Sequence, residues 1–144
     1  MINYTRNKDL YKFLNREDNF SDRLILFLLH FSFFLKNYNS KENKKILQEI
    51  YDFNFRQLEL SIREIGYGDQ SINKKMKDYI NLLHSMVSEL HFWEKFTKIE
   101  KKNFFLYFLS DFENIDHLFD YFDQFNENLS KKTLNSYLKS VSNA

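Results

Sequence analysis

The sequence lacks cysteine and proline altogether, and only two of its 144 residues are glycine. Without cysteine there is no disulfide framework, no thiolate metal site and no thiol nucleophile, so a metal would have to be held by the four histidines and the carboxylates. Rare proline and glycine favour helices. Alanine and valine are also scarce, however, while Phe, Lys, Asn and Ile are abundant, which is the pattern of AT-rich codon usage. Helices must therefore be predicted from periodicity rather than from composition.

The chain also lacks an excess of charge of either sign. Its 21 Lys and Arg against 20 Asp and Glu give a net charge of +1, without the strong basic field typical of proteins that bind duplex nucleic acid. We therefore expect no DNA partner. The length is that of one domain. We expect residues 1–144 to form a single helical domain, with an N-terminal arm or short helix over residues 1–20 and a bundle over residues 21–144.

No apolar run is long enough to cross a membrane. The longest, Leu24–Leu35, has twelve residues and includes His30 and Ser32, whereas a transmembrane helix needs about 20. We predict a helix from Ser21 to about Tyr38 that is buried on nearly every side at the centre of the bundle. An interfacial membrane helix is the alternative. Residues 1–19 are polar and do not resemble a signal peptide.

Apolar residues at steps of three and four predict two further long helices on either side of one turn. The first has its cap at Ser40 and ends at Gly66, which stands where a left-handed C-terminal residue belongs. The second is capped by Asp69 or Ser71. The apolar faces consist of Leu47, Tyr51, Phe55, Leu58, Ile62 and Ile65 in the first helix and of Ile72, Met76, Tyr79, Ile80, Leu83, Met86, Val87 and Leu90 in the second.

Two more helices are predicted towards the C-terminus. Thr97 and Glu100 form a capping box before a short helix that contains Phe104 and Phe105. No stretch alternates with a period of two, so the fold class is all-α, a single-domain bundle of about five to seven helices. A last helix, from about Phe112 to Leu129, has a solvated acidic face formed by Glu113, Asp116, Asp120, Asp123 and Glu127.

The sequence contains no recognisable catalytic or metal-binding motif. The pairs His91/Glu94 and Glu113/His117 have helical spacing, but a di-iron bundle needs two Glu-x-x-His pairs and further carboxylates. Each histidine is predicted to be a surface or core-edge side chain with a local hydrogen bond. The Gly66-x-Gly68 pair follows a helix rather than a strand and lacks a third glycine, so it is not a phosphate loop. We therefore expect no enzyme, no cofactor and no metal.

Large aromatic side chains are abundant, with 17 Phe, 9 Tyr and 1 Trp. They either fill ordinary core positions, as codon bias alone would produce, or leave an exposed apolar patch of the kind that contacts proteins or membranes. The sequence leaves both interpretations open.

The turn around the two glycines has a recognisable sequence. Its core, Arg63-Glu64-x-Gly66-x-Gly68-Asp69, lies within LELSIREIGYGDQSINKKMK at residues 58–77 and resembles the signature of the ubiquinol–cytochrome c chaperone family. Residues 50–53 are similar to the aromatic and acidic lead-in of that family, and residues 102–105 weakly resemble its Arg-Asn-apolar-aromatic element. His84-Ser85-Met86 stands where the family has Tyr-Gly-Arg, which indicates a divergent member.

The resemblance implies an all-helical, non-enzymatic assembly factor that handles newly made cytochrome b for respiratory complex III. In mitochondria such a factor works with a small partner protein near the ribosomal tunnel exit. The implied location is cytoplasmic, with peripheral contact on the inner face of the respiratory membrane as a further expectation. A helical groove lined with Phe, Tyr and Met would suit an apolar client helix. An unrelated helical interaction or regulatory module is the alternative, and a hydrolase or metal enzyme is the remaining class.

The residues of the signature have two interpretations. In the first, Gly66 and Gly68 supply backbone conformations for the turn, and Arg63 braces it by pairing with Asp69 or with the last helical carbonyls. In the second, the polar residues form a docking surface for the client, a small partner chaperone or the ribosome. That surface would comprise Arg63, Glu64, Asp69, Lys74, Lys75 and Lys77, and its lysines, like the clusters Lys41/Lys44/Lys45 and Lys98/Lys101/Lys102, are candidates for contact with ribosomal RNA or anionic lipid.

Overall fold

The computed structural model describes residues 20–109 and 115–142, without the side chains of residues 20–22 and 142. Within these ranges the chain is all-α, with six α-helices, one short 3-10 helix and no strand, as the periodicity predicts. The expected arm over residues 1–20 lies outside the described ranges except for its last residue. The elements are α3 (Phe20–Tyr38), α4 (Lys44–Ile65), α5 (Asp69–Leu90), η1 (Trp93–Lys95), α6 (Lys98–Phe108), α7 (Ile115–Ser130) and α8 (Leu134–Ser142).

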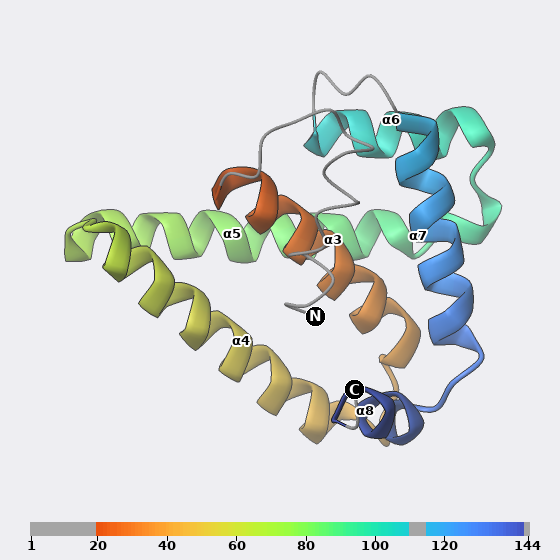
Figure 1. Ribbon diagram of the computed structural model, residues 1–144, viewed down its shortest axis with the longest axis horizontal. Coiled ribbons are helices and arrows are strands. Elements are labelled where there is room, and N and C mark those ends of the chain that lie inside the picture. Colours follow the sequence, from red (N-terminus) through yellow and green to blue (C-terminus); the bar gives the residue numbers. More distant parts are fainter. Residues whose placement is uncertain (1–19, 110–114, 143–144) are drawn as a thin grey trace.

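Helix α3 crosses the middle of the molecule and packs mainly against α5 and α7 (Figure 1). Its side chains are buried on nearly every side, as predicted from its apolar sequence, and even His30 and Ser32 have no exposed surface. The Ser32 hydroxyl donates to the carbonyl of Leu29, so its buried polar atom is satisfied within the helix. Among the described residues, no helix is both long enough and apolar enough to cross a membrane.

Helices α4 and α5 form a V whose arms meet at the glycine turn and diverge towards the rest of the molecule (Figure 1). Their predicted apolar faces point inward, with Phe55, Ile62, Ile72 and Leu83 buried. Ile65, at the end of the predicted stripe, is instead 51% exposed, because α4 by then extends beyond its neighbours.

Both predicted N-terminal caps in this hairpin are wrong, whereas the predicted left-handed residue at the end of the first helix, Gly66, is confirmed. Helix α4 begins at Lys44 with Asn43 as its cap, since Ser40 starts a turn in which its carbonyl accepts the N–H of Asn43 at 3.2 Å. The cap of α5 is Gly68 rather than Asp69 or Ser71. The physical reason is that the Asp69 carboxylate binds a side chain across the turn, so it does not cap the helix that it begins.

The capping box predicted at Thr97 and Glu100 is confirmed. The N–H of Glu100 donates to Thr97 Oγ1, and the N–H of Thr97 donates to Glu100 Oε1, both at 3.2 Å. Just before α6, the buried Trp93 ring donates from Nε1 to Asp123 Oδ1 at 2.9 Å. Lys101 Nζ reaches the same oxygen at 2.8 Å and lies 4.8 Å from the centre of the Trp93 ring. Helices α6 and α7 and the 3-10 turn are thereby fixed to one another.

The prediction of a fully solvated acidic face on α7 is therefore wrong at Asp123. That carboxylate is partly buried because it accepts hydrogen bonds from Trp93 and Lys101. Asp116, Asp120 and Glu127 are exposed as predicted, and Glu113 lies outside the described residues. Helix α7 begins at Ile115 in the described chain, and the stretch before it that includes Phe112 is not described.

Periodicity did not predict α8. It is nine residues long and contributes two buried side chains, Leu134 and Tyr137. The Tyr137 ring lies 5.4 Å from that of Phe34 and 6.1 Å from that of Tyr38, centre to centre. Helix α8 thus covers the C-terminal end of α3.

His30 is fully buried, which corrects the prediction of a surface or core-edge position. Its Nδ1 is 2.6 Å from the carbonyl of Leu26, and its Nε2 is 2.7 Å from the hydroxyl of Tyr121 on α7. The neutral ring satisfies both contacts when Nδ1 donates to the carbonyl and Nε2 accepts from the hydroxyl. Burial lowers the pKa of His30 from 6.5 to about 4, which keeps the ring neutral. The other histidines, His84, His91 and His117, are exposed as predicted.

Candidate docking surface

The residues of the turn signature lie together at the point of the V, which we call the hairpin end and define as residues 59–77 (Figure 1). Gly66 has φ +103° and ψ 18°, and its N–H donates to the carbonyl of Arg63 at 3.0 Å. This left-handed conformation is costly for a residue with a Cβ. Gly68 has φ −73° and ψ 162°, and a Cβ there would have no atom within 4 Å. Only Gly66 is required by backbone geometry.

Arg63 connects the two helices across the turn. Its Nη1 donates to Asp69 Oδ1 at 2.7 Å, and its Nη2 donates to Glu59 Oε1 at 3.1 Å. The hydrogen bonds that Arg63 donates to Asp69 and Glu59 raise the pKa of its guanidinium. Both carboxylates and the guanidinium thus already bind one another within the hairpin end. We therefore interpret them first as groups that stabilise the turn.

The three lysines of the hairpin end have different surroundings. Lys75 Nζ lies 4.5 Å from the centre of the Tyr67 ring, a cation–π contact that folds this side chain against the turn. Lys74 and Lys77 are exposed on the face of α5 opposite Ile72. In the described part of the chain, neither ammonium group forms an ion pair. Glu64 is likewise exposed at the end of α4.

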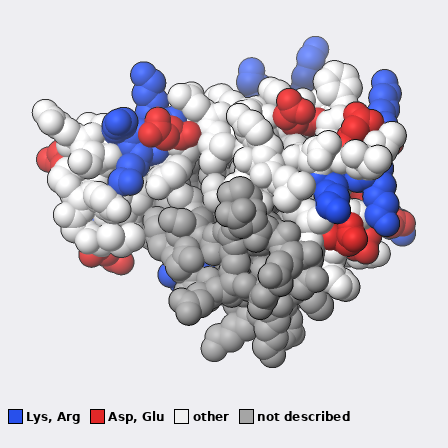
Figure 2. Space-filling model, turned by 90° about the horizontal axis from the view of Figure 1, so that it is seen from above, with Lys and Arg blue, Asp and Glu red and all other residues white. Residues whose placement is uncertain are grey.

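Figure 2 shows the surface from above, with Lys and Arg atoms over the hairpin end at the left and further groups at the right, where α6 lies. A stretch of uncharged surface lies beside the left-hand group. Among the exposed apolar side chains, Ile65 and Tyr67 belong to the hairpin end and are 51% and 43% exposed. The six predicted docking residues are therefore neighbours, but only Glu64, Lys74 and Lys77 present their charges to solvent without a bonded partner among the described residues.

A groove of about 490 Å³ lies between α5 and α6, and sequence reasoning missed it. Its polar lining includes Glu100 and Asn103 of α6, and Tyr107 at its edge is 79% exposed. The remaining lining consists of Ser85 and Glu89 of α5 together with Phe96, Phe104 and Phe108. We call this space the α5–α6 groove.

The signal for this groove was present in α6. Its apolar residues are not all buried, since Phe104 and Phe105 lie in the core while Ile99 is 71% and Tyr107 79% exposed. Apolar side chains that a helix does not bury in its own core remain available on the surface. Most of the described aromatic rings fill the core, whereas Phe53, Tyr67, Phe92 and Tyr107 are exposed.

A second cleft, of about 620 Å³, lies between the diverging arms of the V. Its lining is mixed, with Leu47 and Tyr51 of α4 facing His84, Val87 and Ser88 of α5. His84 is the residue that stands where the similar family has the Tyr of its Tyr-Gly-Arg element. Lys44, Gln48 and Asn39 also stand at the walls of this cleft.

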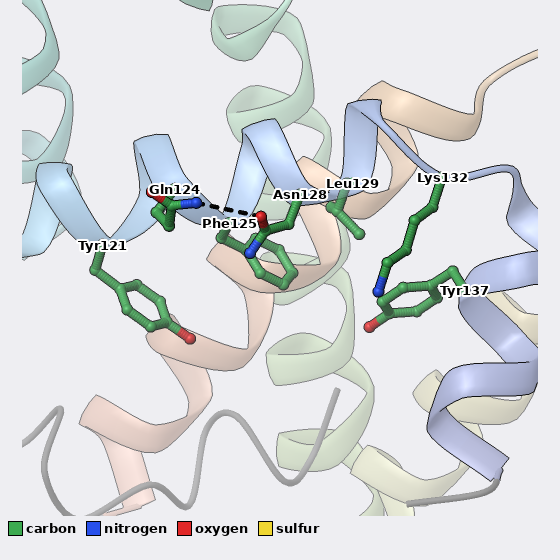
Figure 3. A pocket seen from close by; sticks show the side chains of 7 residues that line it. All are labelled: Tyr121, Gln124, Phe125, Asn128, Leu129, Lys132 and Tyr137. Carbon is green, nitrogen blue, oxygen red and sulfur yellow. Dashed lines mark hydrogen bonds between the residues drawn. The ribbon is translucent and has the colours of Figure 1, made fainter.

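A third, smaller pocket of about 150 Å³ lies between α7 and α8 (Figure 3). Phe125 and Leu129 form its apolar wall, and the side chains of Lys132 and Tyr137 point towards each other across it. Gln124 donates to Asn128 at 3.2 Å along its rim. In the described residues, no three His, Asp or Glu side chains are grouped so as to hold a metal ion, here or elsewhere.

A family model described as ubiquinol-cytochrome C chaperone matches residues 13–91. The matched stretch includes α3, α4, the glycine turn and all of α5, and it ends before η1 and α6. No curated protein and no solved structure matches the chain.

Proposed function

The chain belongs to the ubiquinol-cytochrome C chaperone family, and on that premise we propose that it is an assembly chaperone of respiratory complex III that binds newly synthesised cytochrome b. The observation that carries the proposal is the family match over residues 13–91, which contains the turn signature and the helices it joins. The proposed role is to bind a protein, and it requires no catalysis and no cofactor.

The physical need for such a chaperone follows from the client. Helices that will span a membrane are apolar over about 20 residues and find no favourable partner in water before insertion. A binding protein must offer them apolar surface while remaining folded itself. The exposed Tyr107, Ile99 and Phe92, beside the aromatic α5–α6 groove, support this role because they are apolar surface that the bundle does not use internally.

We assign the hairpin end a separate, polar role. Glu64, Lys74 and Lys77 are proposed to contact the ribosome or a small partner chaperone, while Arg63, Asp69 and Lys75 hold the turn that presents them. The lysines also suit anionic lipid, at about 1 kcal/mol for each one near the surface. We accordingly propose a cytoplasmic protein with peripheral contact at the inner face of the respiratory membrane.

The experiment that tests the proposed function is removal of the chain from its cell. We expect membrane redox difference spectra to lose the cytochrome b absorbance while other respiratory cytochromes persist, because unassembled cytochrome b would be degraded. A normal cytochrome b absorbance in the deletion strain would contradict the proposal. It would favour the alternative, a helical interaction or regulatory module with another client.

A further inference from the structure

We propose that the α5–α6 groove holds one end of an apolar client helix, and specifically an end that carries Lys or Arg. This inference rests on the proposed function for the nature of the client, but the groove's preference follows from its own residues. The expected ligand of the groove is thus an apolar helix that ends in positively charged residues.

The lining supplies apolar contact of the right kind. Phe96, Phe104 and Phe108 line the groove, and Tyr107 at its edge is 79% exposed. Aromatic rings adapt to varied apolar surfaces and contribute large buried areas at interfaces. The Phe104 and Phe108 rings are 5.0 Å apart, centre to centre, so they form a continuous apolar strip along α6.

The size of the groove favours the end of a helix over its whole length. A helix about 10 Å across with a pitch of 5.4 Å fills about 420 Å³ per turn. The groove measures about 490 Å³, which is space for about one turn. A client helix of 20 residues would therefore place about one turn here, with the rest of its length outside the groove.

The charge at the groove selects which end. Its lining contains two carboxylates, Glu89 and Glu100, and no basic residue. The last turn of α5, with the partial negative charge of a helix C-terminus, lies at the same place. Together these groups favour a cation and disfavour an anionic lipid surface or a phosphate.

Two basic residues of α6 are directed away from the groove. Lys101 binds Asp123 at 2.8 Å, and Lys98 Nζ lies 5.5 Å from the centre of the Phe119 ring on α7. Their charges therefore face α7 rather than the groove. Membrane-spanning helices carry an excess of Lys and Arg at their cytoplasmic ends, so the groove matches the end that remains on the chaperone's side of the membrane.

The groove is also held rigidly. Trp93 and Glu94, which connect α5 to α6, are fixed by Asp123 of α7 and by Lys36 of α3 respectively. The pKa of Glu94 is lowered, because burial, which alone would raise it, is outweighed by the hydrogen bonds from Lys36 and Asn126. A site whose walls are fixed before binding loses less entropy when it binds.

The test uses the full chain and two fluorescein-labelled helical peptides of 14 residues, built from Leu and Ala. One ends in two Lys and the other in two Glu. By fluorescence anisotropy we expect the unmodified chain to bind the cationic peptide about tenfold more tightly than the anionic one. Equal affinities, or a preference for the anionic peptide, would overturn the proposal.

Two variants locate the binding. Glu89→Lys should weaken binding of the cationic peptide about tenfold, whereas Asp78→Lys, the same charge change at an exposed position of α5 outside the groove, should leave it unchanged. Ser85→Trp should fill the groove and weaken binding of both peptides. Equal effects of Glu89→Lys and Asp78→Lys would overturn the assignment to this groove, with circular dichroism confirming that each variant is folded.

The same variants distinguish this inference from the proposed function. In the deletion strain, Asp78→Lys should restore the cytochrome b absorbance and Glu89→Lys should not. If the deletion abolishes the absorbance but Glu89→Lys restores it fully, the groove assignment fails and the chaperone proposal stands. If the deletion leaves the absorbance normal, the chaperone proposal fails, and the peptide measurements alone decide the preference of the groove.

Discussion

At the scale of single residues, the most unusual environment is that of His30. A titratable ring lies at the centre of an aromatic core, 4.9 Å from the Phe122 ring and 5.0 Å from the Phe125 ring, with both nitrogens in hydrogen-bond contact. The folded protein therefore accepts this residue only as the neutral ring. That requirement links the stability of the fold to pH.

The link has a definite sign. The pKa of His30 is about 4 in the folded chain and 6.5 as the ordinary value. The unfolded chain thus takes up a proton as the pH falls below 6.5, whereas the folded chain does so only near pH 4. The contribution of His30 to the free energy of unfolding is therefore fully present above pH 6.5 and is lost as the pH falls to 4. The total loss is about 3 kcal/mol.

We expect urea unfolding to show this loss between pH 7 and pH 4. The decrease in the free energy of unfolding should be about 3 kcal/mol smaller in His30→Leu than in His84→Gln. The second variant is the control, because it changes an exposed histidine and leaves the buried one in place. The same pH dependence in both variants would mean that the buried ring does not govern acid stability.

The two glycines make a second prediction for single residues. Gly66 has φ +103°, so Gly66→Ala should lower the free energy of unfolding by about 1 kcal/mol. Gly68→Ala, whose backbone suits any residue, should change it by less than about 0.5 kcal/mol. Thermal denaturation of the two variants checks this, and equal destabilisation would show that the second glycine is required by something other than its backbone.

At the scale of elements, the hairpin end combines a braced turn with outward charges. If it is a docking surface, Lys74→Glu with Lys77→Glu should leave the melting temperature within about 2 °C of the original and abolish binding of the ribosome or partner. Pelleting with ribosomes and melting by circular dichroism measure the two effects.

A matched control is Lys41→Glu with Lys45→Glu, an equal charge reversal in another exposed basic cluster. Loss of binding in both double variants would indicate general electrostatic attraction instead of a defined surface. A drop in melting temperature without any specific loss of binding would leave the hairpin end with a purely structural role.

Much of this arrangement could be predicted from sequence because it depends on local spacing. Periodicity gave α3, the hairpin and the capping box at Thr97, each of which is determined within a few residues. The N-terminal caps of α4 and α5 were mispredicted, and at α5 the reason is that the Asp69 side chain, which could cap a helix, binds Arg63 instead. Helix α8 has only two buried residues, too few for a period.

The features that could not be predicted from the sequence depend on contacts between residues far apart in the chain. Tyr121, the partner of His30, is 91 residues away in sequence, and Asp123 is 30 residues from Trp93. No spacing rule indicates such pairs. The α5–α6 groove was missed for the same reason, because it exists only where two helices meet.

At the scale of the whole molecule, the hairpin end and the α5–α6 groove lie on different parts. The hairpin end, at the point of the V, presents charges, while the aromatic groove lies between α5 and α6, away from that point (Figure 1). One long helix, α5, runs from the first to the second. A protein arranged in this way can contact its site of action through one region and hold a client with the other, which suits a chaperone in the assembly of complex III.

The most direct test of that account is whether the chain holds cytochrome b before complex III forms. Cells should be pulse-labelled with radioactive methionine, and the tagged chain isolated at intervals during a chase. We predict that labelled cytochrome b copurifies early and leaves as labelled complex III accumulates. Labelled cytochrome b entering complex III without ever copurifying with the chain would contradict the account.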